Sequence, residues 1–166
     1  MERYDEFSDF VASRWARLVR SAVLLGCSPA EAEDVVQTAL ELCLRKWSLV
    51  RGADDRDAYV HRVLINTFTS SRRRRWVGER PTAVLPEEHG PDRADEVDLA
   101  DAVLRALRTL STEQRAVVVL RYYAHLSEKQ TAEALGVAPG TVKSRLSRAL
   151  RALAGDPDLV ELRGAP

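Results

Sequence analysis

Apolar residues recur at helical spacing along most of the chain, and the pattern is clearest in residues 126–153. Ser127 followed by Gln130 has the spacing of a capping box, which predicts the start of a short helix. Gly136 stands where that helix should end, and Pro139 suits the first turn of a second helix, where its missing N–H costs nothing. The segment therefore predicts a helix-turn-helix. Its second helix has one apolar stripe, formed by Val142, Leu146, Leu150 and Leu153.

The same periodicity predicts further helices at 5–24, 29–47, 56–76 and 114–123, and no segment has a strand-rich pattern. Helices are also expected to resume near Glu96 after an interruption. The candidate core positions are Phe7, Phe10, Val11, Trp15, Leu18, Leu25, Val35, Leu40, Leu42, Leu44, Tyr59, Val63 and Phe68, followed by Leu104, Leu107, Leu110, Val117, Val118, Leu120, Leu135, Val142 and Leu146.

Residues 77–97 interrupt the periodicity with prolines and glycines, which predicts a flexible linker. We therefore expect an all-α protein with two small helical domains, at 5–76 and 98–155, and a tail at 156–166. Each domain is near the size at which one hydrophobic core is only just sufficient for stability.

The composition is typical of a soluble globular protein, with 45% hydrophobic and 30% charged residues among 166. No apolar run is long enough for a membrane span, and the acidic N-terminus has no signal-peptide core, so we expect a cytoplasmic protein without membrane insertion. The formal net charge of zero conceals three blocks. Residues 56–80 form a basic block, with seven arginines and two carboxylates. Residues 85–101 form an acidic block, with seven carboxylates and one arginine. Residues 102–153 form a second basic block, with nine cations and three carboxylates. Local basic blocks of this kind can bind phosphates despite the neutral average.

The residues with catalytic or metal-binding chemistry are few and scattered. Cys27 and Cys43 do not have the spacing of a zinc site or a disulfide framework, so they are interpreted as core thiols in preference to a redox switch. No nucleophile–base pair, phosphate loop or metal-ligand spacing is present in the sequence, so we expect neither an enzyme, nor a metal, nor a cofactor. The histidines are expected on the surface or in packing: His61, His89 and His125.

The second helix of the predicted helix-turn-helix is basic on the side that its apolar stripe leaves open. Its cations and hydroxyls, including Lys143, Ser144, Arg148 and Arg151, could reach phosphates and base edges in a major groove. The alternative is an ordinary helical hairpin with a solvated basic face. The ordered set of cap, turn glycine, N-terminal proline and basic face favours DNA binding.

Three segments, in this order, resemble the extracytoplasmic-function (ECF) sigma factors of bacterial RNA polymerase, in the SigE-like form of actinobacteria. Residues 32–40 resemble the helix that grips the β′ clamp helices. Residues 59–67, followed by the arginines at 72–75, resemble the segment that melts and binds the −10 element. Residues 140–149 resemble the helix that binds the −35 element. The resemblance covers the chain from about Phe7 to Leu153.

The resemblance implies roles for particular residues. Asp34 and Gln37, three apart on one helix face, together with Glu41, would contact core polymerase, although a solvated polar face is the alternative. Asn66 would contact a flipped −10 base, and the arginine run would bind phosphates unless it is a generic polyanion patch. Tyr59 stands where many relatives carry tryptophan, while Trp47 and Trp76 are interpreted as core or interface residues rather than base platforms. The −10 set is Tyr59, Arg62, Asn66, Arg72, Arg73, Arg74 and Arg75.

The −35 set has Arg121 as a phosphate contact. The family carries serine or bulkier residues at the position of Ser147, so the resemblance transfers no base preference. The implied partners are core RNA polymerase, through the β′ clamp helices and β flap, promoter DNA and an anti-sigma factor. The acidic linker would pass through the RNA exit region or shield the basic blocks. The −35 set is Arg121, Thr141, Lys143, Ser144, Arg145, Ser147 and Arg148.

The sequence thus favours a sigma factor that binds core polymerase, selects promoters through −35 and −10 elements and promotes melting. One alternative is a stand-alone regulator of the LuxR type, which would bind duplex DNA as a dimer and would need neither the Asp34–Gln37 surface nor Asn66. The other alternative is a helical enzyme or ligand-binding domain fused to a DNA-binding module, and no polar constellation supports it.

Overall fold

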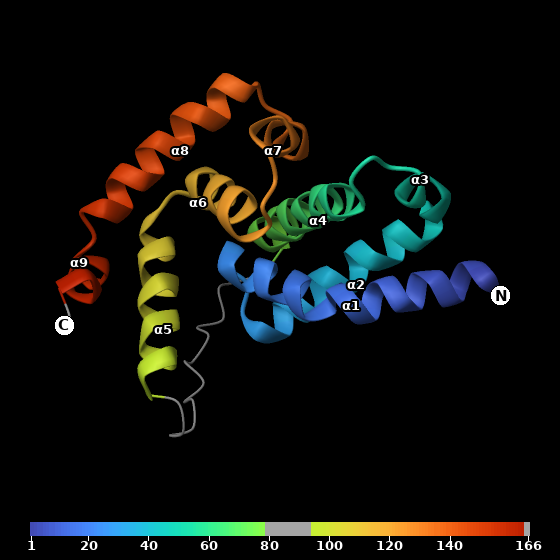
Figure 1. The fold of residues 1–166 in the computed structure, drawn as a ribbon, viewed down its shortest axis with the longest axis horizontal. Helices are drawn as coiled ribbons and strands as arrows, with labels where there is room; N and C mark the ends of the chain where they lie inside the picture. The colour runs from blue at the N-terminus through green and yellow to red at the C-terminus, as the bar shows by residue number, and fades with distance from the viewer. Residues whose placement is uncertain (79–93, 165–166) are drawn as a thin grey trace.

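The computed structural model describes residues 1–78 and 94–164, and every regular element in this part of the chain is helical (Figure 1). The all-α prediction is confirmed. In order, the elements are α1 (Glu2–Leu25), α2 (Pro29–Arg45), α3 (Trp47–Arg51), α4 (Arg56–Gly78), α5 (Ala94–Thr109), α6 (Thr112–Val118), the π-helix η1 (Val119–Tyr123), α7 (Glu128–Leu135), α8 (Pro139–Ala154) and α9 (Pro157–Gly164).

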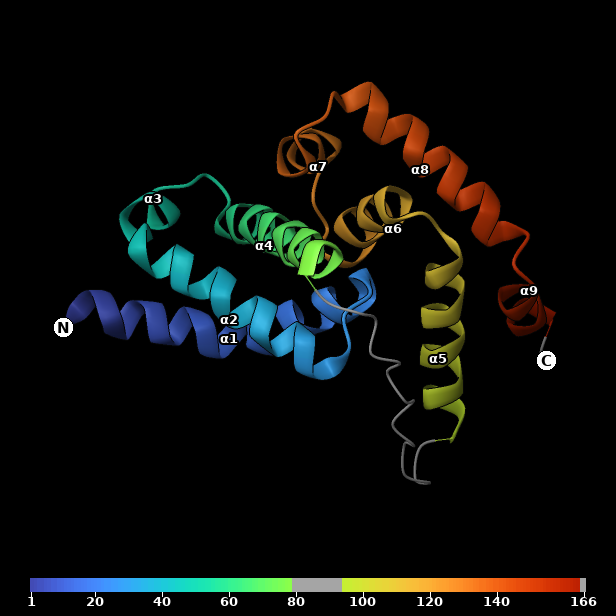
Figure 2. The same ribbon diagram turned by 180° about the vertical axis from the view of Figure 1, so that it is seen from behind.

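The N-terminal half is a bundle in which α1 and α2 lie side by side and α4 packs against α2 (Figures 1 and 2). Its core is built around Trp47, which is only 1% exposed and lies 5.2 Å from the ring of Phe7 and 5.4 Å from that of Phe10. Large buried aromatic residues contribute most to the stability of such a small core. Trp47 is therefore a core residue, as expected.

Three helices begin with the capping boxes that the sequence contains. The hydroxyl oxygens of Ser28, Ser111 and Ser127 each accept a hydrogen bond from the backbone N–H three residues later, and the Glu or Gln there accepts one in return. Such caps contribute about 1 kcal/mol each. Gly136 ends α7 with a left-handed φ of 65°, the conformation that favours glycine. Local sequence signals therefore fix where these helices begin and end.

Two predicted core positions are wrong. Leu150 is 39% exposed, and its place in the apolar stripe of α8 is taken by Ala149, which is fully buried. The stripe thus runs through Val142, Leu146, Ala149 and Leu153, at spacings of four, three and four, which follow the helical period more closely. Leu42 is 43% exposed for the same reason, because Leu40 and Cys43 already occupy the buried side of α2.

Two elements, α3 and α9, were not predicted, and η1 departs from the predicted helix at 114–123 in its winding. α3 is a single turn that follows α2 directly, and η1 continues α6 with the wider π-helical winding. α9 lies within the predicted tail. Asp156 caps it by accepting hydrogen bonds from the backbone N–H groups of Asp158 (3.0 Å) and Leu159 (3.4 Å), and Asp158 pairs with Arg105 on α5 at 2.9 Å.

The two halves of the chain are in contact, mainly where α7 lies against α4 and where α1 meets α6 and η1. Arg17 donates to the carbonyl of Tyr123 (3.2 Å), Gln130 donates to the carboxylate of Asp55 (3.0 Å), and Arg115 donates to a carbonyl of α1. One apolar cluster includes residues from both halves. The division into two domains stays a prediction.

The predicted linker is shorter at both ends than expected, since α4 continues to Gly78 and α5 begins at Ala94. Residues 79–93, with three of the seven carboxylates of the acidic block and with His89, lie outside the described residues. Of the helices that the structure describes, none combines the length and apolar character that a bilayer crossing requires.

Candidate functional site

The polymerase-binding candidates lie on the open face of α2. Asp34, Gln37 and Glu41 are all exposed, whereas Val36 and Ala39 between them point into the core. The amide of Gln37 donates to the carboxylate of Glu41 at 3.4 Å. The structure thus brings the three predicted residues together on one surface, with side chains that are available to a partner.

The −10 candidates separate into two groups along α4. Tyr59, Arg62, Asn66 and Arg73 lie on one face, at spacings of three, four and seven residues. Arg62, Asn66 and Arg73 are exposed, while the ring of Tyr59 packs partly against the core. This face, extended by Thr69 and Trp76 at the same period, is called the α4 stripe below.

Arg72 and Arg75 differ from these residues because they are engaged within the protein. Arg72 stacks over the ring of Phe68, with its guanidinium carbon 5.2 Å from the ring centroid, and donates to the carbonyl of Gly26 at 2.6 Å. Arg75 forms an ion pair and hydrogen bond with Glu31, and Arg72 also approaches that carboxylate at 4.0 Å. The predicted arginine run therefore does not form one continuous surface.

Glu31 thus combines a capping role with an ion pair. Burial alone would raise the pKa of its carboxyl group, but hydrogen bonds from Arg75 and from the backbone of Ser28, together with the charges of Arg75 and Arg72, hold the pKa below its usual value. Glu31 is therefore ionised at neutral pH and competes with any external anion for these two arginines.

Trp76 shows a feature that sequence reasoning missed. Its side chain is 93% exposed at the end of α4, so of the two predicted roles, core or interface, the core role is wrong for Trp76 and the interface role stays a prediction. The helical period from Asn66 through Thr69 and Arg73 to Trp76 was the signal that could have placed it on the α4 stripe.

The helix-turn-helix consists of α7 and α8 and is held by a small cluster in which Val117, Ala132 and Val142 are buried. Its second helix, α8, runs along the outer edge of the molecule in both views (Figures 1 and 2). Four of the −35 candidates are exposed and form two i, i+4 pairs, Lys143 with Ser147 and Ser144 with Arg148. Thr141 and Arg145 are half-buried beside them.

Arg121 differs from the other −35 candidates because it is bound within the protein. It lies on η1 and donates from Nη1 to the carbonyl of Leu126, in the segment before α7. Its buried Nε has no partner among the described residues. In this arrangement Arg121 holds the segment between η1 and α7, and a phosphate contact stays a prediction.

The buried titratable groups act in packing. His61 donates from Nδ1 to the carbonyl of Asp57 (2.8 Å), its Nε2 lies 3.3 Å from the hydroxyl of Ser21, and burial lowers its pKa. Burial also raises the pKa of Cys43 to about 11 and raises that of Cys27 despite the nearby charge of Arg72. Both thiols are therefore neutral core groups. No cluster of metal-ligating side chains occurs within residues 1–78 and 94–164.

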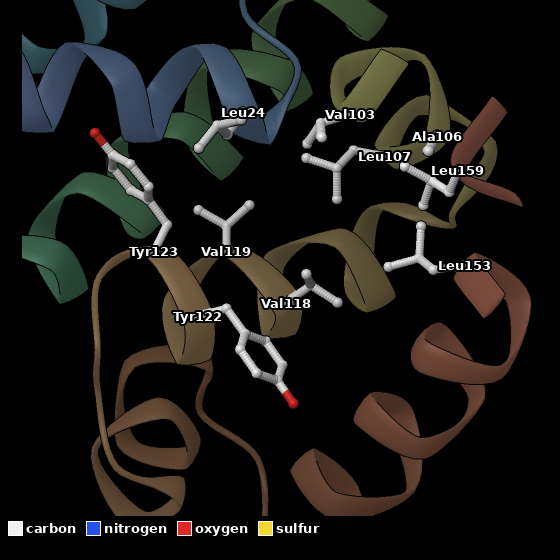
Figure 3. A pocket seen from close by; sticks show the side chains of 10 residues that line it. All are labelled: Leu24, Val103, Ala106, Leu107, Val118, Val119, Tyr122, Tyr123, Leu153 and Leu159. Carbon is white, nitrogen blue, oxygen red and sulfur yellow. The ribbon is translucent and has the colours of Figure 1, made fainter. Parts of the chain in front are cut away.

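One apolar pocket of about 270 Å³ lies mainly among helices of the C-terminal half, and Leu24 near the C-terminal end of α1 completes its wall (Figure 3). The sequence alone could not reveal this pocket, because each residue that lines it occupies a position typical of any helix packed in a core. The residues that line it are Leu24, Val103, Ala106, Leu107, Val118, Val119, Tyr122, Tyr123, Leu153 and Leu159.

Comparison with known proteins finds similarity along most of the chain. Residues 100–153 match the family described as Sigma-70, region 4. Over 148 residues, the chain is 40% identical to the RNA polymerase sigma-E factor of Streptomyces coelicolor, covering 89% of this chain and 84% of that protein. Over 146 residues, it is 39% identical to the ECF RNA polymerase sigma factor SigL of Mycobacterium tuberculosis, covering 83% and 81% of the two chains.

Solved structures show a similar fold. The sigma factor RpoE from Bartonella quintana, in a co-crystal structure with the anti-sigma factor NepR, has a TM-score of 0.68 and 28% identity, over 89% of this chain and 94% of that one. CnrH, solved in complex with the cytosolic domain of CnrY, has a TM-score of 0.62 and 24% identity, over 89% and 84% of the two chains.

Proposed function

The chain belongs to the ECF sigma factors of RNA polymerase. From this premise we propose which partner in transcription initiation each of its three exposed surfaces binds. As a sigma factor, the chain directs RNA polymerase to specific promoters. The observation that carries the proposal is the 40% identity over 148 residues, because this similarity spans all three surfaces and not the helix-turn-helix alone. This long similarity disfavours a stand-alone regulator of the LuxR type, because such a regulator would resemble the chain only in its helix-turn-helix.

The first surface is the open face of α2, which we assign to core polymerase. Asp34, Gln37 and Glu41 offer carboxylates and an amide at the spacing of neighbouring helical turns. Such groups can pair with arginines and backbone groups of the β′ clamp helices. Their acidity suits a protein partner better than DNA, since carboxylates repel phosphates.

The second surface is the α4 stripe, which we assign to the −10 element. The exposed amide of Asn66 can hydrogen-bond to the edge of an unpaired base, and Arg62 and Arg73 on either side can contact phosphates. The half-buried Tyr59 at the start of the stripe offers an aromatic ring for stacking. Arg72 and Arg75 join this surface only if the DNA displaces Glu31 and Gly26 from them.

The third surface is the open face of α8, which we assign to the major groove of the −35 element. Lys143, Ser144, Ser147 and Arg148 combine phosphate-binding cations with short hydroxyls that can approach base edges. The β flap is the expected polymerase contact of this half of the chain. The match of residues 100–153 to Sigma-70, region 4 supports this assignment.

An anti-sigma factor is a further proposed partner. The solved sigma factor RpoE from Bartonella quintana was crystallised with the anti-sigma factor NepR, and it covers 89% of this chain at 28% identity. We expect the chain to act in the cytoplasm and to perform no covalent chemistry itself, as its similarity to sigma factors implies.

The test is a pull-down of the purified chain with bacterial core RNA polymerase, followed by run-off transcription on a genomic promoter library. Stable association with promoter-selective transcripts is the expected result, and it would also reveal the −35 and −10 sequences. Duplex DNA binding by the chain alone, without association with polymerase, would instead identify a stand-alone regulator.

A double variant separates the surfaces. Asp34→Ala with Gln37→Ala should weaken binding to core polymerase while the thermal melt stays unchanged. The matched control is Glu2→Ala with Asp5→Ala, since this exposed pair has the same spacing on α1. An equal loss of polymerase binding in both variants would contradict the assignment of the α2 surface.

A further inference from the structure

Trp76 is the most exposed large apolar side chain among the described residues apart from the N-terminal Met1, at 93%. It lies at the C-terminal end of α4, next to Val77, which is 87% exposed. An indole ring left in water loses the favourable free energy of burial, so such a residue often marks a binding site. The class of ligand that would bind this ring follows from the residues around it.

The position of Trp76 links it to the α4 stripe. It follows Asn66 by ten residues and Arg73 by three, so all three side chains lie on one face of the helix, with Trp76 about 15 Å along the axis from Asn66. Arg73, one helical turn before it, is exposed, with no hydrogen bond or ion pair to any residue that the structure describes. The ring is thus the end of a cationic surface.

The surroundings favour nucleic acid over a protein partner. A protein interface would continue the apolar surface around its anchor. Within the described end of α4, Val77 is the only apolar neighbour of the ring, and four consecutive arginines precede it. An aromatic ring within a cationic track is the combination that holds single strands, because the base stacks on the ring while the cations hold the backbone. Duplex DNA hides its base faces, so the fitting ligand is an unpaired base.

We propose that Trp76 stacks on an unpaired base of the melted promoter, while Arg73 holds the phosphate beside that base. The inference rests on the proposed function of the α4 stripe and extends it by a base-stacking residue. Trp76 then holds the separated strand about 15 Å from the base that Asn66 contacts.

The test uses the full chain assembled with core RNA polymerase and a fork-junction promoter whose unpaired strand carries 2-aminopurine at one position at a time. With the wild-type chain, fluorescence at one position should be quenched on binding. Trp76→Ala should remove that quenching and weaken fork binding about five- to hundredfold, the effect of losing one stacked base. Trp76→Tyr should retain most of both effects, and affinity for fully paired DNA should not change.

Controls separate the outcomes. Tyr4→Ala removes another exposed aromatic, outside the arginine run, and should change nothing. The inference is overturned if Trp76→Leu binds and quenches as the wild type does, if Trp76→Ala weakens core polymerase binding instead, or if Trp76→Ala behaves as the wild type. If the wild-type holoenzyme itself fails to bind the fork, the proposed function is wrong rather than this inference alone.

Discussion

Glu31 offers a direct test of how the fold limits DNA binding, because it holds two arginines that the sequence assigns to the promoter. Glu31→Gln removes the negative charge but keeps an oxygen that can complete the capping box with Ser28. The variant should therefore lose only the ion pairs. Since Arg72 and Arg75 are nearly half exposed, solvent screens these pairs, and the expected loss of folding stability is about 0.5–1 kcal/mol.

The effect on DNA should have the opposite sign. Releasing an arginine adds up to one phosphate contact, and each contact steepens the dependence of log K on log salt by about 0.7 to 0.9. Arg72 is also held by Gly26 and Phe68, so Arg75 should account for most of the change. We expect tighter binding of the holoenzyme to fork-junction DNA at low salt, with a slope steeper by up to one unit.

The assay is fluorescence anisotropy of labelled fork DNA over a series of KCl concentrations, with stability followed by thermal melts. Glu33→Gln is the matched control, because Glu33 is exposed on the same helix and forms no ion pair with the described residues. An unchanged slope in Glu31→Gln, or the same change in Glu33→Gln, would refute the competition between Glu31 and DNA.

The pH dependence provides an internal check. The pKa of Glu31 is lower in the folded chain than its ordinary value of 4.5, so its contribution to stability is complete above that value. This contribution disappears as the pH falls through the folded pKa. The stability difference between the wild type and Glu31→Gln should therefore vanish in acid.

Three further predictions follow from buried or exposed side chains. Burial lowers the pKa of His61, so stability should fall as the pH drops below 6.5, by at most about 1.4 kcal/mol per pH unit, and His61→Gln should lessen the fall in thermal melts. Cys27 and Cys43 should react with a thiol reagent only after unfolding, and rapid reaction of the folded chain would show that they are not core thiols. Arg148→Ala should weaken promoter binding by about 1–3 kcal/mol, whereas the exposed Arg20→Ala should not.

The helices were predictable where the deciding interactions are local. Each capping box joins residues three apart, and Gly136 needs its left-handed φ whatever lies elsewhere in the fold. The same local chemistry could also have predicted α9, since Asp156 followed by Pro157 is a cap followed by an N-terminal proline. The error at Leu150 arose from a stripe with two consecutive spacings of four, which drift around the helix.

The state of the candidate site could not be predicted in the same way. Arg75 meets Glu31 across 44 residues of sequence, and Arg115 meets Leu25 across 90. Nothing in the spacing of either residue indicates its partner, because these contacts depend on how helices pack. The sequence therefore predicted which residues carry charge, but not which of those charges the fold already neutralises.

The contact between the two halves has a consequence for promoter recognition. The −35 and −10 elements are named for positions about 25 base pairs apart, which is about 85 Å of straight duplex at 3.4 Å per pair. In the structure α7 of the helix-turn-helix lies directly against α4, and Gln130 of α7 is hydrogen-bonded to Asp55 just before α4. One chain in this arrangement cannot place α8 on one element and the α4 stripe on the other. Simultaneous recognition therefore requires α7 to leave α4, which breaks the hydrogen bonds of Gln130, Arg17 and Arg115 between the halves.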